Sequence, residues 1–500
     1  MTRSQALGGL EQNVVRLFGL LVCAAVVLPT LPRLGVVAGA LAVVLGAGVA
    51  WLLWRWAPAG VDGARRRRPV VAALWALGAL LAVVQLGRLS AFMADPERIW
   101  GSVVPDPAAA DHACLSAYIV AADLSRRGTS NLYDERYYPA FAGDAARLLA
   151  PGDVRGLKKW MDDPYEYPPP FLIFPRAVLG VTDDFLAIRA GWFVLQALGL
   201  IVVGAWLARW VGGRDGQLVF LLLPLILASL PTMLGLQFGQ FHVASLLLAV
   251  AAMICFEGRR PAVGGALLAV AMVSKLFPAF LLVFLMARKR WRDVAWTLGG
   301  CVVFSLMGLA VLGWTPFDAF LSYQLPRIQT GEAFSFYEDK ELVVSRNLGI
   351  PGLVTKLHWF GVPGMTHGVG AVLGWLFTFL LLWLAWTGGR RAEGRVAEAR
   401  MWLALLTLGA FRSPLAPPYV TLSMLWLLTL LAGEIRGRTS RIVGFVAAWL
   451  LIMGTPPLTG GPEFVVSALG QIAGLAVCGW AVLGTRPTAS DAPAPGLAVG

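Results

Sequence analysis

The sequence predicts an all-α membrane protein that crosses the bilayer many times, and three observations carry this prediction. Of its 500 residues, 58% are hydrophobic and 14% are charged, whereas soluble domains average about 25% charged residues. The mean hydropathy is +0.70, and apolar runs approaching or exceeding the roughly 20 residues of a membrane helix recur along the chain. The formal net charge of +12 lies mostly in short basic runs beside these segments, as the positive-inside rule describes.

The apolar runs divide the chain into a membrane bundle, two polar loops and a tail. Candidate spans are 14–31, 34–56, 69–92, 168–182, 185–210, 218–236, 241–256, 262–287, 294–313, 367–387, 399–431 and 440–484. The last two are long enough for two helices each, so we expect about 11–14 crossings. We interpret 1–484 as one transmembrane domain. Residues 485–500 are rich in Pro and Ala without an apolar period, which predicts a disordered tail.

The basic runs predict which ends of the spans face the cytoplasm. They are 65–68, 259–260, 288–292, 390–391 and 436–441. With these runs inside, the polar stretches 93–167 and 314–350 are extracytoplasmic loops. Arg209 and Arg214 do not fit an ordinary hairpin made of the two preceding candidate spans. Either one of those spans is re-entrant or the rule fails there.

The chain shows no pattern typical of metal, disulfide or nucleotide binding. Its five cysteines are scattered, and no Cys/His spacing predicts a metal site. No Walker or Gly-rich motif offers a place for a soluble nucleotide. The acidic pairs Asp162-Asp163 and Asp183-Asp184 are typical of solvated turns. We expect no metal and no cofactor.

The first loop contains a periodic segment. Leu115, Tyr118, Ile119 and Ala122 share one face at helical spacing, which predicts an amphipathic helix over 112–127 lying on the outer membrane surface. The polar residues at the start of this helix could have a structural or a catalytic role.

Asp111 stands where this helix begins. A carboxylate there is a favoured N-cap, and it could also act as a catalytic base. The two roles are compatible, because a capping carboxylate can present its second oxygen to a substrate. His112 adds a second titratable group beside it.

Three polar interruptions fall at the ends of spans. Lys275, with Pro278 after it, breaks the run 262–287 into two short half-helices. A lysine within a span costs about 2.5–3.5 kcal/mol, so it either snorkels to the interface or serves as the cation for a lipid-linked phosphate. Gln240 and His242 either bind a hydroxyl-rich ligand or cap helix ends. Arg412 marks the third break.

The order of these motifs resembles glycosyltransferase family 87, the polyprenyl-phosphate-mannose-dependent mannosyltransferases of the GT-C fold. The resemblance extends from about residue 70 to 430. It rests on Asp111, Gly128 with Leu132-Tyr133, Tyr167-Pro168-Pro169, Gly239-Gln240, Ser274-Lys275-Leu-Phe-Pro278 and Arg346-Asn347-Leu-Gly-Ile350. The chain departs from the family after Ser413-Pro414, where Pro417-Pro418-Tyr419 stands in place of the usual tryptophan and histidine.

The resemblance implies an inverting hexosyltransferase in the cell membrane, with its active site on the extracytoplasmic side. The donor would be a polyprenyl-phosphate sugar, and the resemblance to the family implies that the sugar is mannose. The acceptor would be a lipid or a glycan. Asp111 matches the family's general base. The expected donor-binding residues are Lys275, Gln240, Arg346, Asn347 and Arg412, and the expected acceptor-binding residues are His112, Tyr118, Tyr167 and His242.

Two alternatives stay open. One is a polytopic lipid or sugar transporter or flippase, which also needs charged groups in a membrane cavity. The long outer loop, the scarcity of acidic residues within the spans and the lack of visible repeats argue against it. The other is a GT-C relative with a different donor or a protein acceptor.

Overall fold

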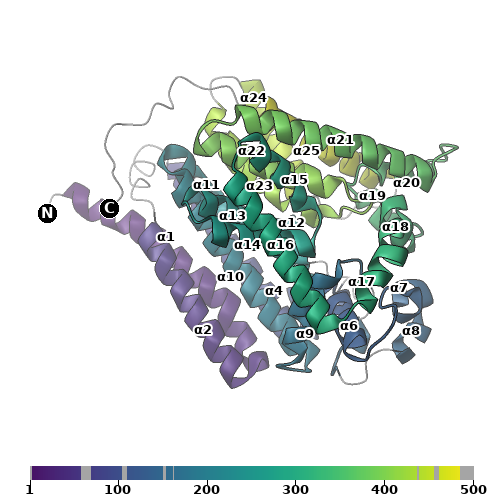
Figure 1. The fold of residues 1–500 in the computed structure, drawn as a ribbon. Coiled ribbons are helices and arrows are strands. Elements are labelled where there is room, and N and C mark those ends of the chain that lie inside the picture. The colour runs from purple at the N-terminus through teal and green to yellow at the C-terminus, as the bar shows by residue number, and fades with distance from the viewer. Residues whose placement is uncertain are drawn as a thin grey trace.

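The computed structural model describes residues 3–57, 69–103, 110–149, 154–160, 163–435, 439–454 and 461–484. These residues are helical apart from turns and one isolated bridge between Arg155 and Asp184. The helices form a bundle with a cluster of short helices at one end (Figure 1). The predicted disordered tail, 485–500, lies outside the described residues.

Six helical segments of the described chain are long and apolar enough to cross a membrane. They are Gln12–Trp56, Ala72–Ala94, Phe185–Val211, Trp291–Leu312, His367–Arg391 and Gly461–Leu483. The first comprises two packed helices, α1 (Arg3–Val27) and α2 (Leu31–Trp56). Helices α11 (Gly213–Leu227) and α12 (Leu230–Gln237) follow each other with a bend of 58°. If this bent pair is one broken span, it is the seventh. The polytopic all-α class is confirmed, whereas the number of crossings stays a prediction.

The other helices fall into bundle and loop groups. The bundle contains α4 (Pro69–Ala94), α10 (Phe185–Val211), α13 (Phe241–Glu257), α14 (Pro261–Ser274), α15 (Phe280–Ala287), α16 (Trp291–Leu312), α21 (His367–Arg391), α22 (Gly394–Phe411), α23 (Leu422–Leu431), α24 (Thr439–Met453) and α25 (Gly461–Leu483). The loop group contains α6 (Leu115–Arg126), α7 (Pro139–Ala142), α8 (Asp144–Leu149), α9 (Ile173–Leu179), α17 (Thr315–Ala319), α18 (Leu325–Thr330), α19 (Glu341–Arg346) and α20 (Leu353–Trp359). Each of the last two candidate spans holds two helices, as predicted.

The bundle has an inner and an outer layer. Every residue of α23 is buried, and Trp402 of α22 and Trp426 of α23 are among the largest fully buried side chains. On α2, α16 and α21, by contrast, many large apolar side chains are exposed. An apolar exterior of this kind is unfavourable in water and is typical of a surface that faces the hydrocarbon core of a membrane.

The helices α14 and α16 approach each other backbone to backbone. A Cβ atom added at Gly265 would lie 2.6 Å from the carbonyl carbon of Trp296. Small residues permit this close approach, which favours helix association within a membrane.

The basic turns gather at one end of the bundle, called the basic end below. Arg290, before α16, forms ion pairs with Glu257 of α13 and Glu398 of α22. Arg395, at the start of α22, donates a hydrogen bond to the carbonyl of Trp210 at 3.1 Å. The turns after α13, before α16 and before α22 therefore meet the end of α10 there.

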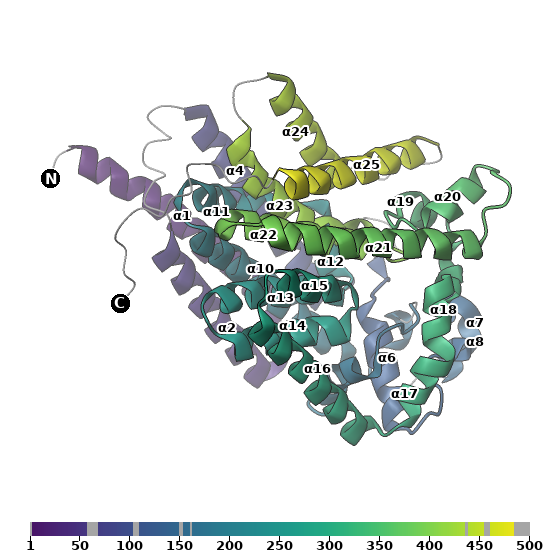
Figure 2. The ribbon, with the colours of Figure 1, turned by 45° about the horizontal axis from the view of Figure 1, so that its top comes forward.

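The two polar loops gather at the other end, called the loop end. Arg327 of α18 pairs with Glu135 of the first loop, and the rings of Tyr133 and Phe320 lie 5.8 Å apart. Figure 2 shows α6, α7, α8, α17 and α18 together at this end.

The candidate span 168–182 does not reach the basic end. It forms a 3-10 turn, Pro169–Leu172, followed by α9, which packs against α6. After α9, Asp183 pairs with Arg155 of the first loop at 2.9 Å. Helix α10 therefore starts at the loop end and carries Arg209 to the basic end. Of the two interpretations left by the sequence, the structure agrees with the re-entrant one.

Two expectations for the first loop need correction. The helix α6 begins at Leu115, with Cys114 at the N-cap position and no side-chain cap, so Asp111 does not cap it. The residues from Leu115 to Ser125 are all buried, so α6 is enclosed by the protein and does not lie on the membrane surface.

Candidate functional site

Lys275 occupies the predicted break between α14 and α15. Its backbone is extended, with φ −143° and ψ 125°, and a 3-10 turn with Pro278 follows. The lysine is partly buried, and its Nζ lies 4.8 Å from the centroid of the Tyr167 ring. Such a cation–π contact directs the ammonium toward the first loop.

Tyr167, which is half-buried, belongs to a network of polar groups. Its hydroxyl lies 2.9 Å from that of Tyr118. The Tyr118 hydroxyl accepts a hydrogen bond from the Phe241 N–H at 3.2 Å and lies 3.4 Å from Oε1 of Gln240. Three residues predicted to bind ligand, Tyr118, Tyr167 and Gln240, are therefore in contact.

Gly239 shapes the turn that carries Gln240. Its φ of +66° favours glycine, and an added Cβ would lie 2.9 Å from the Cβ of Leu115. Its carbonyl accepts a hydrogen bond from the Trp192 indole at 2.9 Å. The Gly-Gln element is thus fixed by backbone geometry and by close packing against α6.

His242 lies deeper in the bundle. Its ring stacks on Phe277 with centroids 4.8 Å apart and lies 6.1 Å from the ring of Tyr419. The side chain is buried, so it packs under the break at Lys275.

Glu166 brings a carboxyl group that the sequence interpretation missed. Its Oε1 is buried and has no hydrogen-bond partner. Burial raises the pKa of Glu166 well above its usual 4.5, the negative charge of Asp163 raises it further, and the positive charges of Lys275 and Arg327 oppose the shift. Its position between two tyrosines, two residues before the prolines of the re-entrant segment, was the available signal.

Asp163 was expected in a solvated turn, and this expectation is wrong. It is partly buried, and its Oδ2 lies 3.5 Å from Nε2 of His112. The same nitrogen lies 3.3 Å from Sγ of Cys114. Burial is the largest of the effects that raise the pKa of the Cys114 thiol to about 11. Asp162 lies outside the described residues, and Asp184 of the second acidic pair caps α10.

Asp111 directly precedes His112 and pairs with a lysine of the first loop. Its Oδ1 is 3.0 Å from Nζ of Lys159, and its side chain is 43% exposed. Its charge also acts on Arg189, whose guanidinium is buried and donates to the carbonyl of Phe92 at 3.2 Å. The contacts that the structure describes place Asp111 beside Lys159 and not against Lys275.

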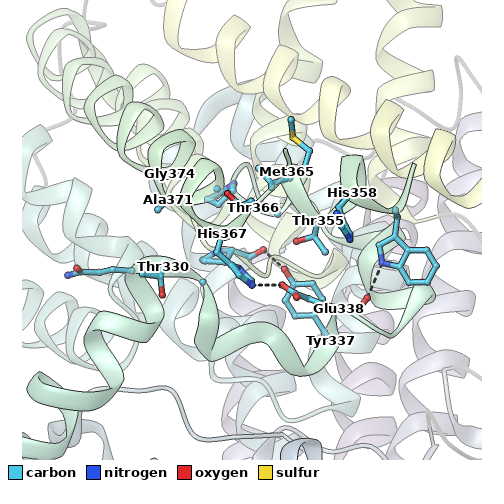
Figure 3. A pocket seen from close by; sticks show the side chains of 18 of the residues that line it. Thr330, Tyr337, Glu338, Thr355, His358, Met365, Thr366, His367, Ala371 and Gly374 are labelled. Atoms are coloured by element: carbon cyan, nitrogen blue, oxygen red, sulfur yellow. Dashed lines mark hydrogen bonds and ion pairs between the residues drawn. The ribbon is translucent and has the colours of Figure 1, made fainter. Parts of the chain in front are cut away.

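A cavity of about 610 Å³ opens between the second loop, α20 and α21 (Figure 3). Tyr337, Glu338, His358, His367 and Arg412 are among its lining residues. Nε2 of His367 lies 3.4 Å from a carboxylate oxygen of Glu338. The sequence interpretation selected only Arg412 from this lining, because the acids and the histidines come from separate segments of the chain and meet only in the fold.

Tyr337 connects the cavity with the cluster at Lys275. Burial raises the pKa of Tyr337 to about 12, and the charge of Glu166 adds to the shift. The same carboxyl acts on Lys275. The carboxyl of Glu166 therefore acts electrostatically both on Tyr337 of the cavity and on Lys275 of the broken span.

The remaining predicted donor-binding residues lie apart from Lys275. Arg412 donates to Oγ1 of Thr378 at 3.0 Å and borders the cavity. Arg346 pairs with Glu463 at 2.9 Å. Asn347 is buried, and its amide bonds the segment after Arg412: Nδ2 donates to the carbonyl of Pro414 at 2.7 Å. The contacts of Arg346 and Asn347 join chain segments to each other.

These features define a polytopic membrane protein with polar side chains clustered at the loop end of its helical bundle. The model of Glycosyltransferase family 87 matches residues 165–418, slightly more than half of the chain. The protein belongs to this family, which confirms the predicted resemblance and favours a glycosyltransferase over a transporter. The matched region contains Gln240, Lys275 and Asn347, and it begins after Asp111.

The chain also resembles one curated protein. A polyprenol-phosphate-mannose-dependent alpha-(1-2)-phosphatidylinositol mannoside mannosyltransferase of Mycolicibacterium smegmatis is 26% identical over 368 residues. The similarity covers 68% of this chain and 78% of the relative. No solved structure matches the chain.

Proposed function

We propose that this glycosyltransferase moves mannose, with inversion, from a polyprenyl-phosphate donor to a lipid-linked or glycan acceptor at the extracytoplasmic face of the cell membrane. The donor class follows the family and the name of the similar mannosyltransferase. The face follows the basic end, which the positive-inside rule assigns to the cytoplasm. The site then lies where a lipid-held sugar and a water-exposed acceptor can meet.

The position of Lys275 is the observation that carries this proposal. The lysine interrupts an apolar run at the loop end and turns toward Tyr167. When the sugar–phosphate bond breaks, the leaving phosphate gains negative charge. A preorganised cation that meets this developing charge stabilises the transition state. Gln240, held by the Gly239 turn, would orient the sugar beside it.

The cavity of Figure 3 suits the acceptor. Its carboxylate, hydroxyl, imidazole and guanidinium groups match the hydrogen-bonding needs of a polyhydroxylated headgroup. Trp359 adds an aromatic side chain that is 41% exposed and offers an apolar surface to a sugar ring. Arg412 could balance a phosphate on a lipid acceptor.

Asp111 is the proposed general base, because the other nearby carboxyl groups suit that task less well. Burial raises the pKa of Glu166 well above its usual 4.5, which disfavours the ionised form that a general base needs. Asp163 is engaged by His112. Asp111 is exposed enough to meet an acceptor hydroxyl, and its partner Lys159 is itself 59% exposed. General-base assistance contributes about 10²–10⁴-fold in rate.

The test is sugar transfer by the purified protein in lipid vesicles. Synthetic polyprenyl-phosphate mannose and glucose are offered with phosphatidylinositol mannoside or free oligomannoside acceptors, and the anomeric configuration of the product is determined by NMR. Transfer of mannose with inversion supports the proposal. Absence of transfer from every polyprenyl-phosphate sugar would refute the donor class.

Asp111→Asn tests the base in the same assay. We expect a loss of about 10²–10⁴-fold in kcat. Asp144→Asn is the matched control, because the Asp144 side chain is fully exposed and pairs only locally with Arg147. Full activity of Asp111→Asn would exclude Asp111 as the base and leave the donor class standing.

A further inference from the structure

Three side chains of different chemistry converge beside the start of α6. Nε2 of His112, Sγ of Cys114 and a carboxylate oxygen of Asp163 all lie within 4.8 Å of one another. The nitrogen lies 3.3 Å from the sulfur and 3.5 Å from Oδ2 of Asp163. A nitrogen, a sulfur and a carboxylate oxygen are the three donor types that zinc prefers.

The two distances from the His112 nitrogen match those between ligands of one metal ion. Zinc binds such ligands at about 2.0–2.3 Å, so ligand atoms at tetrahedral angles lie about 3.3–3.8 Å apart. The two contacts of the His112 nitrogen fall in this range. One imidazole nitrogen offers a single hydrogen or a single lone pair, so it cannot form two full hydrogen bonds. A shared ion would use all three donors at once.

The surrounding backbone holds the donors in place. The Leu115 N–H donates to the carbonyl of Phe238 at 3.1 Å, which anchors the chain just after Cys114. The ring of Phe238 also meets the His112 imidazole edge to face, with centroids 4.7 Å apart. Asp163 arrives from the segment leading to Tyr165, a fully buried side chain. Fixed neighbours of this kind reduce the cost of ordering metal ligands.

We propose that His112, Cys114 and Asp163 form a site for a divalent metal ion of the zinc type. Three protein ligands leave at least one coordination position for water or a substrate oxygen. The negative charges of Asp163 and of a Cys114 thiolate would compensate the charge of the ion. The site does not rest on the proposed mannosyl transfer.

Cobalt(II) is the probe that tests this site without an activity assay. The purified full chain, freed of metal with a chelator, is titrated with Co²⁺. A thiolate-to-cobalt charge-transfer band in the near ultraviolet is expected, and added Zn²⁺ should abolish it. The band should disappear in Cys114→Ser and persist in Cys301→Ser, a matched control because Cys301 is a free, partly buried cysteine on α16.

Thermal unfolding provides a second readout, which also separates loss of the site from loss of the fold. Zn²⁺ should raise the Tm of the wild-type chain, and the rise should continue with the logarithm of the Zn²⁺ concentration once this exceeds the Kd. It should leave the Tm of His112→Gln and Asp163→Asn unchanged, while both variants still unfold cooperatively. The proposal is overturned if Co²⁺ gives no band, if the band survives in Cys114→Ser, or if Zn²⁺ raises the Tm of wild type and variants equally. Those outcomes would leave a hydrogen-bonded triad without a metal.

Discussion

The ammonium nitrogen of Lys275 lies 4.8 Å from the centroid of the Tyr167 ring. This contact joins the broken span to the re-entrant segment, because Tyr167 directly precedes the three prolines that begin it. The Tyr167 hydroxyl meets Tyr118 of α6 in turn. One lysine thus connects a bundle helix with the first loop.

Replacing Lys275 by Met should lower kcat/KM for the polyprenyl-phosphate donor by about 10²–10³-fold, the usual effect of removing one group that stabilises developing charge. The Tm should stay constant or rise, because methionine does not carry the desolvation cost of a lysine. Lys340→Ala, at an exposed position of the second loop, is the control and should keep full activity. Unchanged transfer by Lys275→Met would rule out its role at the phosphate.

Glu166→Gln should change how stability depends on pH. A carboxyl whose pKa is raised in the folded state binds its proton more tightly there than in the unfolded chain. The stabilisation from this group is complete below pH 4.5, its usual pKa, and is lost as pH rises toward the raised value. Glutamine resembles the neutral carboxyl, so the variant should lose less stability as the pH rises above 4.5. Thermal unfolding across this range measures the difference. A wild-type chain that gains stability relative to Glu166→Gln with rising pH would contradict the expectation.

Asn347→Ala should act mainly on stability. The Asn347 Oδ1 accepts hydrogen bonds from the N–H groups of Gly349 and Ala416, both at 2.9 Å. Truncation leaves buried groups unpaired, at a cost of about 1–3 kcal/mol for each. Asn131→Ala is the control, because the Asn131 side chain accepts one local bond from the Tyr133 N–H. A normal Tm combined with a raised KM for the donor would instead support the donor-binding role predicted from the sequence.

Gly265→Ala should destabilise the contact between α14 and α16. The new methyl group would lie 2.6 Å from the carbonyl carbon of Trp296 and 2.8 Å from the nitrogen of Thr297, and overpacking of this kind costs about 1–3 kcal/mol. Gly299→Ala on α16 is the control, since nothing lies within 4 Å of its added Cβ. Unfolding in detergent, followed by circular dichroism, should show a lower midpoint only for Gly265→Ala. Equal midpoints would mean that the helices can separate without cost.

The break at Lys275 could be predicted because its cause is local. A charged residue and a proline within one apolar run are unfavourable for a continuous helix wherever the run packs. The start of α6 could not be predicted in the same way. The Leu115 N–H finds its acceptor in the carbonyl of Phe238, a residue distant in sequence. A tertiary contact thus supplies an acceptor at the helix start, and Asp111 is left to pair with Lys159.

The acids at the site escaped the sequence interpretation for a similar reason. Asp163 and Glu166 are separated from Lys275 by more than one hundred residues of chain, and nothing around Asp163 distinguishes a buried carboxyl from a solvated one. Cys114 likewise looked isolated until the fold brought Asp163 to it. The family pattern located Gln240 and Lys275, whereas the contacts around them depend on how the loops fold back.

The turn at α9 determines the direction in which every later helix crosses the membrane. A hydropathy plot that counted 168–182 as a crossing would invert each later segment. Gln240 and Lys275 would then face the opposite aqueous compartment from Tyr118 and Asp111, with a hydrocarbon barrier of about 30 Å between them. A segment too short to span the membrane is therefore what allows the two halves of the site to share one compartment.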